Sequence, residues 1–280
     1  MAVRFDRRRG GPFAPTLPPV DGRFSKRTAT CDLCTRAHHR GGVRAIEVEG
    51  LAKLYGDKPA LRDVSLAVEA GEFFGLFGPN GAGKTTLLKI LTGQLRPSRG
   101  KTTVLGIDPT MEPIRLKAAV GIVPEVESPP SYLTAGEYLW FVGRVRGVDG
   151  LEGRIAEWFE FFDLGGVRAT VCKDLSKGTR QKLMLAAAML HEPKLLFLDE
   201  PFINLDPIFQ RKLRGRLEDH VGAGGTVFMA SHLLDIAERL CDHVAIIHEG
   251  RIVADGAIQD VTRGHADLEA AFLRLVGDGR

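Results

Sequence analysis

The residues best suited to chemistry form one glycine-rich run in the first third of the chain. It reads Gly78-Pro79-Asn80-Gly81-Ala82-Gly83-Lys84-Thr85-Thr86. The run fits the pattern G-x-x-x-x-G-K-[ST], in which glycines leave the loop free of side chains so that backbone N–H groups converge on phosphate oxygens. The lysine would neutralise β- and γ-phosphates, and the first threonine would help to hold Mg²⁺. The run therefore predicts a site for the phosphates of a nucleoside triphosphate.

The flanking residues predict the elements that position this loop. An apolar run at 73–77 precedes it and a second one at 87–91 follows it, which indicates strand, loop and helix in that order. Such a helix would present its positive dipole end to the phosphates. A plain turn between strand and helix would explain Gly78 and Gly83, but it would not explain a lysine followed by two threonines.

Two further apolar strands end in residues that can bind metal or move protons. The run 195–198 ends in Asp199-Glu200, and the run 226–230 ends in Ser231-His232. Continuous apolar strands that alternate with helices indicate a parallel sheet covered on both faces. The two asparagines, Asn80 and Asn204, do not begin the N-K-x-D run that reads guanine, which argues against GTP specificity.

Composition places the chain among ordinary globular proteins. It has 280 residues, 44% of them hydrophobic and 26% charged, which allows one large domain or two small ones. Four cysteines without a signal peptide favour a reducing cytoplasm. No stretch approaches the ~18 consecutive apolar residues of a membrane span. If the protein works at a membrane, another chain is expected to cross it.

The positive charge belongs to the N-terminal extension. Residues 1–44 hold ten Arg or Lys against three Asp, which is +7, so the remainder carries −4 of the total of +3. These residues are rich in Arg, Pro and Gly without an apolar period, and we expect them to be disordered. A basic tail can be drawn to anionic lipid or nucleic acid, but a solvated extension without function, or a start codon assigned too early, is the simpler account.

A group of zinc-ligand residue types lies within this extension. Cys31 and Cys34 are followed by His38 and His39. Only three residues separate Cys34 from His38, whereas a zinc finger needs about twelve to build its helix. The spacing therefore argues against a zinc site.

The remaining patterns predict further elements. Runs at 46–49 and 64–68 alternate as half-exposed strands, 102–106 and 120–125 predict short strands, and 244–256 predicts a hairpin that turns at Glu249-Gly250. Thr134 and Glu137 form a capping box that opens a helix through about residue 146, and further helices are expected at 151–163 and 266–276. The helix that begins after Thr134 carries apolar residues on or near one face: Leu139, Phe141, Val142 and Val145. The aromatic residues of the helix at 151–163 are expected to lie in the core: Trp158, Phe159 and Phe162.

A second motif identifies a family. Residues 175–181 read Leu-Ser-Lys-Gly-Thr-Arg-Gln before a predicted helix, with Ser176 standing 23 residues ahead of Asp199. This run resembles the signature motif of ATP-binding cassette (ABC) proteins. Across about 45–256, seven features follow that family's order: Tyr55, the phosphate loop, Pro124-Glu125, the signature, 195–200, Asn204-Leu205-Asp206 and His232.

The resemblance implies a fold and a domain organisation. The expected fold is an α/β P-loop NTPase core with a mixed, mostly parallel sheet, an N-terminal antiparallel β subdomain and an inserted helical subdomain. The nucleotide-binding domain would occupy 45–256, with its helical subdomain at about 110–185, and a helical tail would occupy 257–280. Two ATP molecules would be buried between two subunits arranged head to tail.

The resemblance also assigns roles to residues, with ATP and Mg²⁺ as ligands. Glu200 would polarise the attacking water or accept its proton, and His232 would contact the γ-phosphate. Residues expected to hold Mg²⁺ are Thr85, Glu125 and Asp199. Residues expected to bind the nucleotide are Tyr55, Gly78, Pro79, Asn80, Gly81, Ala82, Gly83, Lys84, Thr85 and Thr86, together with Ser176 and Gly178 acting across the dimer.

Two departures point to one branch of the family. Glu125 replaces the usual glutamine, and the signature reads Ser-Lys-Gly-Thr where Ser-Gly-Gly-Gln is commoner, so Lys177 adds a positive charge. Both resemble the subunits that serve ABC-2 type exporters, as does the C-terminal run at 268–275. Neither departure removes a catalytic group.

Three functions compete. The first is the ATPase subunit of an exporter, which would work with a separate transmembrane permease and a second nucleotide-binding subunit. It would act in the cytoplasm, bound peripherally to the inner face of the membrane only through the permease, and it would bind no nucleic acid. The second is a soluble ABC ATPase acting on nucleic acid or in metal-cluster assembly, which the basic extension alone favours. The third is a non-hydrolysing regulator, against which Glu200 and His232 argue. The cargo, the direction of transport and the choice of homodimer or heterodimer are not encoded.

Overall fold

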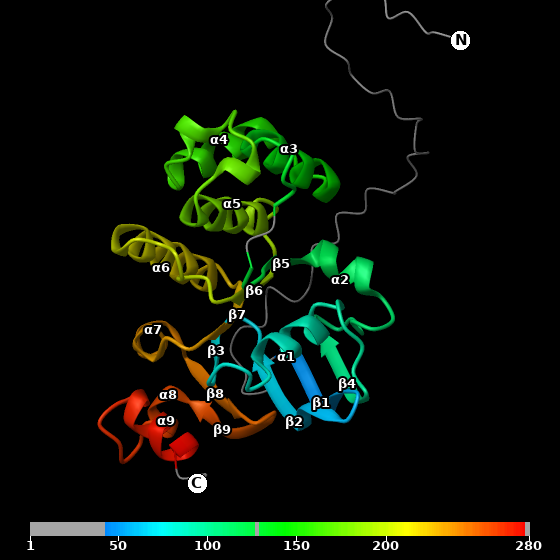
Figure 1. Cartoon of the computed structure of the whole chain (residues 1–280), viewed down its shortest axis with the longest axis vertical. Coiled ribbons are helices and arrows are strands. Elements are labelled where there is room, and N and C mark those ends of the chain that lie inside the picture. The colour runs from blue at the N-terminus through cyan, green and yellow to red at the C-terminus, as the bar shows by residue number, and fades with distance from the viewer. Residues whose placement is uncertain (1–42, 127–128, 278–280) are drawn as a thin grey trace, which may run out of the picture. The chain divides into compact units, whose positions relative to one another are not determined.

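The computed structural model describes residues 43–126 and 129–277 (Figure 1). The extension predicted to be disordered and the cysteine and histidine group at 31–39 therefore lie outside the described residues, except for the last two positions of the extension. The first strand, β1 (Arg44–Tyr55), begins one residue before the predicted boundary at 45.

The strands form two sheets. The smaller sheet has the order β2-β1-β4, in which β2 (Lys58–Glu69) and β4 (Arg99–Val104) both run antiparallel to β1. The larger sheet has six strands: β5 (Val120–Val123), β6 (Leu195–Asp199), β7 (Thr226–Ser231), β3 (Phe73–Phe77), β8 (His243–His248) and β9 (Arg251–Ala257). Neighbours from β5 to β8 are parallel, and β9 alone pairs antiparallel, with β8. The mixed, mostly parallel sheet and the antiparallel subdomain are thus confirmed.

Side chains of the central strands alternate between two apolar clusters. Phe73 and Phe77 of β3 pack in a cluster with the helical part of the chain. Phe74 and Leu76, from the other face of the same strand, pack with the antiparallel sheet and α1 (Lys84–Leu91). Since all five residues of β3 are buried, the larger sheet is covered on both faces, and this explains the continuous apolar runs.

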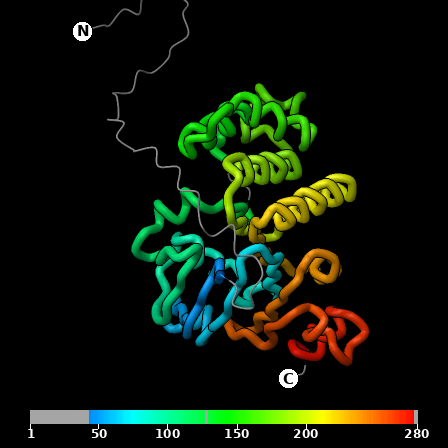
Figure 2. Tube along the Cα trace, turned by 180° about the vertical axis from the view of Figure 1, so that it is seen from behind, coloured from blue at the N-terminus to red at the C-terminus, as the bar shows by residue number. Residues whose placement is uncertain are grey.

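Three helices stand together at one end of the described domain (Figures 1 and 2). They are α3 (Ala135–Arg146), α4 (Leu151–Phe161) and α5 (Lys177–Met189). The predicted capping box is present, because the Thr134 side chain accepts from the Glu137 N–H at 3.2 Å and the Glu137 carboxylate accepts from the Thr134 N–H at 2.8 Å. Trp158, Phe159 and Phe162 are buried as expected, and Cζ of Arg216 lies 5.1 Å from the centroid of the Trp158 ring.

Two features of this region depend on tertiary packing. The range 110–185 begins too early, because it includes β5, whose four residues pair in parallel with β6 in the larger sheet. Only α2 (Pro113–Ala119) precedes β5 there. Phe141 and Val145 of α3 are 52% and 68% exposed, since the buried face of that helix passes through Leu139 and Gly143, one turn apart.

The C-terminal part continues from the sheet into short helices. After β7, α7 (Leu234–Leu240) leads to the β8–β9 hairpin, which turns at Glu249-Gly250 as predicted. Helices α8 (Ile258–Val261) and α9 (Leu268–Gly277) follow, and α9 packs on α7. Helix α6 (Pro207–Gly222) lies between β6 and β7 in the chain, and 3₁₀ turns occupy Gly165–Val167 and Cys172–Asp174. Among the described residues, no helix is both long and apolar enough to cross a bilayer.

Candidate nucleotide site

The glycine-rich loop joins β3 to α1, and two of its glycines, Gly78 and Gly83, have no room for a side chain. A Cβ added at Gly78 would lie 2.2 Å from the carbonyl oxygen of Ile247, and one at Gly83 would lie 2.8 Å from that of Ala60. Gly83 also has φ of 116°, which a residue with a side chain rarely adopts. No side chain caps the first N–H groups of α1. Those donors are therefore left for an anion held by the loop.

Lys84 is enclosed by the loop that precedes it. Its side chain is only 6% exposed, and Nζ donates to the carbonyl oxygens of Gly78 at 2.7 Å and Pro79 at 3.3 Å. Burial lowers the pKa of Lys84, while the negative charges of Glu200 and Asp199 act to raise it. The buried cation thus faces acidic groups as well as the loop, an arrangement that suits a bound metal–phosphate pair.

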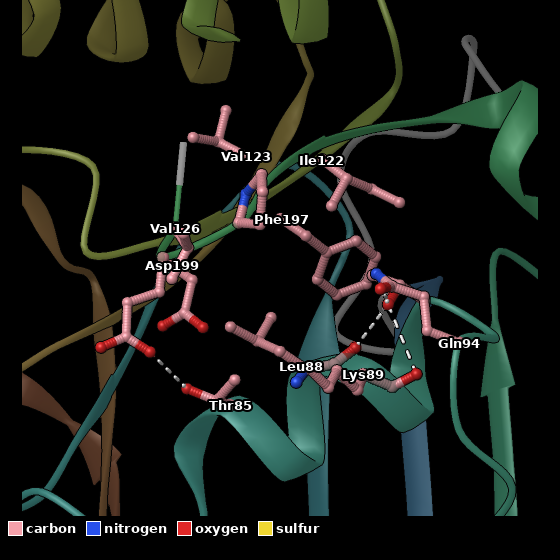
Figure 3. Close-up of a pocket in the computed structure, with 12 residues that line it drawn as sticks. Thr85, Leu88, Lys89, Gln94, Ile122, Val123, Val126, Phe197 and Asp199 are labelled. Carbon is pink, nitrogen blue, oxygen red and sulfur yellow. Dashed lines mark hydrogen bonds between the residues drawn. The ribbon is translucent and has the colours of Figure 1, made fainter. Parts of the chain in front are cut away.

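Oxygen-bearing side chains gather between the start of α1 and the end of β6, where Figure 3 shows Thr85 and Asp199. Thr85 Oγ1 lies 3.4 Å from Oε2 of Glu125, and Thr85, Glu125 and Asp199 all line one hollow of about 200 Å³. Asp199 is 4% exposed, and its Oδ1 has no hydrogen-bond partner among the described residues. Burial raises the pKa of Asp199 to about 6, against the lowering effect of Thr85. An unsatisfied buried carboxylate with a second carboxylate and a hydroxyl nearby matches the oxygen ligands that Mg²⁺ prefers.

Glu200 and His232 are brought together by the pairing of β6 with β7. Nδ1 of His232 lies 2.7 Å from Oε1 of Glu200, and Ser231 Oγ donates to Oε2 of the same carboxylate at 2.8 Å. Glu200 has φ of 52°, a left-handed conformation that is costly for a residue with a side chain, and its N–H donates to the Ala230 carbonyl oxygen. Glu200 is 6% exposed, so the carboxylate is held from two sides in a buried position.

The signature residues begin α5 and pack against the segment that follows Glu200. Ser176 is the N-cap, and its Oγ accepts from the Thr179 N–H at 3.1 Å. A Cβ at Gly178 would lie 2.6 Å from the carbonyl oxygen of Asn204. Among the described residues, no hydrogen bond or ion pair joins this turn to the 78–86 loop. The two turns for which phosphate binding is predicted are therefore not joined by these contacts within one chain.

Comparison with known proteins decides the family. The family described as "ABC transporter" matches residues 61–203. The chain is 37% identical to the Nod factor export ATP-binding protein I of Rhizobium leguminosarum bv. viciae, over 80% of this chain and 71% of that protein. It is 38% identical to the daunorubicin/doxorubicin resistance ATP-binding protein DrrA of Streptomyces peucetius, over 83% of this chain and 70% of that one. The chain belongs to the ABC transporter family.

A solved structure supports the same assignment. The chain superposes on the structure of an ATP binding subunit of an ABC transporter with a TM-score of 0.78 at 32% identity, covering 82% of this chain and 99% of that one. As a member of the ABC family, the chain is an ATP-binding subunit and an ATPase, and the glycine-rich loop is where that chemistry is expected.

Tyr55 and Thr86 complete the set of sequence-predicted ABC residues. Tyr55 ends β1 with 51% of its surface exposed, and Nζ of Lys53 lies 5.4 Å from its ring centroid. The ring face is therefore open to stacking. Thr86 lies in the first turn of α1, directly after Thr85.

Sequence reasoning missed two residues of this ABC site. Ser231 holds the Glu200 carboxylate, and the only signal for it was a hydroxyl at the strand end before His232. Gln181 is 2% exposed and its Nε2 donates to the Pro201 carbonyl oxygen at 3.1 Å, which ties α5 to the residue after Glu200. A glutamine on the buried face of a helix was the available signal.

Proposed function

We propose that this chain is the ATP-hydrolysing subunit of an ABC-2 type exporter that drives a separate transmembrane permease. The single observation that carries the hydrolytic part is the buried Glu200 carboxylate, which Ser231 and His232 hold at the edge of the sheet beside the phosphate loop. The two curated relatives described above are an export protein and a drug-resistance protein by name, which supports the transport part.

The nucleotide would bind with its phosphates on the loop and its adenine against Tyr55. Residues 78–86 offer backbone N–H groups, and Lys84 offers a charge that already lies within the loop. The exposed Tyr55 ring offers a stacking face. Specificity for adenine would rest on stacking rather than on hydrogen bonds to the base.

Mg²⁺ would be held by Thr85, Asp199 and Glu125. Two observations support this: Oδ1 of Asp199 has no hydrogen-bond partner among the described residues, and Oγ1 of Thr85 lies 3.4 Å from Oε2 of Glu125. When bound, the cation would neutralise charge on the phosphates. Glu125 differs from glutamine in that an ionised carboxylate can ligate a cation but cannot donate a hydrogen bond.

Glu200 would act on the attacking water and His232 would act on the γ-phosphate. The carboxylate has one oxygen toward Ser231 and one toward His232, so its orientation is set before substrate arrives. With Nδ1 of His232 turned toward the carboxylate, Nε2 is the nitrogen left to meet a phosphate oxygen. Preorganised groups of this kind contribute to rate because they need not reorient during the reaction.

The second phosphate-binding feature implies a second subunit. Ser176 and Gly178 open α5, where N–H groups can receive an anion, yet within residues 43–126 and 129–277 no hydrogen bond or ion pair joins them to the loop. We infer that they close the γ-phosphate pocket of a partner cassette placed head to tail. Hydrolysis would then remove charge that bridges the two subunits and let the dimer open.

The permease is proposed to contact the surface around 125–138. Its described part includes Val126 and Tyr132, which are 69% and 88% exposed. Exposed apolar side chains of this size suit a protein partner. The subunit would thus lie peripherally at the membrane, held there by the permease.

Replacing the catalytic carboxylate tests the proposal. For Glu200→Gln we expect ATP turnover to fall roughly hundredfold or more, while ATP binding persists and an ATP-bound dimer accumulates in light scattering. Glu218→Gln, an exposed change on α6, is the matched control and should behave as the wild type. Unchanged turnover in Glu200→Gln would remove the hydrolytic assignment.

A further inference from the structure

A second hollow, away from the phosphate loop, is lined by three arginines. It has a volume of about 260 Å³ and lies between α6 and α7. Figures 1 and 2 show these two helices one after the other on the same flank of the larger sheet. Arg211 and Arg214 come from α6 and Arg239 comes from α7, and Asp235 is the only acidic residue in the lining.

The three arginines have no partners in the part of the chain that the structure describes. None of them forms a hydrogen bond, ion pair or ring contact there, and Asp235 forms no ion pair with any of them. By contrast, Arg216 on the same helix packs over a tryptophan ring. With three arginines and one aspartate, the lining carries a net charge of about +2. Like charges gathered around one hollow repel each other, and nothing else in the lining compensates them.

The order of charges along α6 adds to this imbalance. Its Arg and Lys residues lie in the middle, from Arg211 to Arg216, and the acidic residues Glu218 and Asp219 follow them, so that the N-cap Asp206 is the one acidic group ahead of the basic run. A helix is stabilised by the opposite order, with acids near its N-terminus and bases near its C-terminus. An anion beside the first half of α6 would offset both unfavourable arrangements.

We propose that this hollow binds a small phosphate-bearing anion. Guanidinium groups match phosphate oxygens with paired donors, and a charge of about +2 is balanced better by a phosphate group than by a single carboxylate. The hollow is smaller than the pockets of about 300–1,000 Å³ that take drug-sized ligands, and this suits a phosphate or diphosphate group. The group can belong to a free solute or to a phospholipid headgroup.

The position of the hollow connects this anion to the hydrolytic pair. Phe202 lines it two residues after Glu200, and Asp235 lines it three residues after His232. Gln210, also in the lining, donates from Nε2 to the carbonyl oxygens of Phe202 and Leu205, both at 3.1 Å. An anion held by arginines of both helices would therefore brace α6 and α7, the helices that follow the two catalytic strand ends.

The test measures anion binding with the phosphate loop already filled. The full chain, with excess ADP and EDTA, is titrated with pyrophosphate by calorimetry. We expect one additional site, which the double variant Arg211→Gln/Arg214→Gln weakens at least roughly tenfold. The control Arg251→Gln/Arg274→Gln changes the net charge by the same amount at exposed positions outside the hollow and should keep the wild-type affinity.

A lipid arm distinguishes the two sources of the phosphate group. Vesicles of phosphatidylglycerol in phosphatidylcholine are sedimented with each protein. If the wild type sediments with the vesicles, the hollow variant does not, and pyrophosphate releases the wild type, the phosphate group belongs to a lipid headgroup. If the hollow and control variants sediment equally, it belongs to a free solute. Equal pyrophosphate affinity in the hollow and control variants, or no site beyond ADP, overturns the proposal. Matching melting temperatures for the two double variants keep the comparison free of folding effects.

Discussion

The N-termini of α1 and α5 are both suited to phosphate, but they are built differently. At α1 the N-cap is Gly83, no side chain occupies the first N–H groups, and Lys84 is buried within the preceding loop. At α5 the N-cap is Ser176, which already accepts one N–H from the first turn, and both Ser176 and Lys177 are exposed. One helix end forms a pocket, and the other forms a surface.

This difference explains why one chain carries a complete loop and only half of a second contact. A pocket can surround its ligand without help, whereas an exposed turn needs a ligand presented from outside. The α5 turn is rigid all the same, because Ser176 caps it and Gly178 lies against the Asn204 carbonyl. A rigid, exposed and cationic turn fits a nucleotide carried by another copy or by a related subunit.

The largest expected effect is at the enclosed end. Lys84→Ala removes the only basic side chain that reaches the loop carbonyls in the described structure, and we expect ATPase activity to fall roughly hundredfold or more. Nucleotide affinity, followed with a fluorescent ATP analogue, should weaken as well. Lys101→Ala, an exposed change on β4 that lies outside the lining of the Thr85–Asp199 hollow, should retain activity. If both variants lost ATPase activity equally, the loss could not be assigned to the contact between Lys84 and the loop.

An intermediate effect is expected at the exposed end, where subunits can be mixed. Ser176→Ala should cost about 1 kcal/mol of stability through the lost cap, and it should lower turnover in the dimer by less than Lys84→Ala does, while each monomer still binds ATP. Mixing Ser176→Ala with Lys84→Ala should restore part of the ATPase rate, because one of the two composite sites then has an intact loop and an intact turn. A mixture that remained inactive would mean that each chain closes its own site.

The smallest effect separates stability from assembly. Lys177 is the first helical residue of α5, where a positive charge opposes the helix dipole. Lys177→Glu should therefore stabilise the isolated chain by about 0.3–1 kcal/mol in chemical denaturation. The same change should weaken ATP-dependent dimerisation, measured by analytical ultracentrifugation, because it places a negative charge toward phosphates. If Lys177→Glu strengthened ATP-dependent dimerisation as well as the stability of the isolated chain, the composite site would be contradicted.

The sequence predicted features in which local residue pattern and tertiary environment agree. The run 73–77, the glycine loop and the Thr134–Glu137 capping box all appear where they were expected. The placement of β5 was not predictable from its four residues, because only pairing with β6 shows that it belongs to the larger sheet. Exposure of Phe141 likewise depends on which neighbours cover α3.

The candidate site was predictable in its membership but not in its geometry. Motif order indicated Glu200 and His232, yet the 2.7 Å contact between them depends on the register of β6 against β7. The left-handed backbone of Glu200 had no sequence signal, since glutamate, unlike glycine or asparagine, has no special preference for it. The arginine-lined hollow joins helices separated by a strand, so no local pattern could reveal it.

The contact between Gly178 and Asn204 has a consequence for timing. Asn204 belongs to the segment that leaves Glu200, and Gly178 belongs to the turn proposed for the partner's nucleotide. Under the proposed function, each chain would link the place where it cleaves one ATP to the place where it contacts the other, through this approach and through the hydrogen bond from Gln181 to the Pro201 carbonyl oxygen. Two cleavage events so connected would not proceed independently, and the ATP dependence of the rate should be sigmoidal rather than hyperbolic.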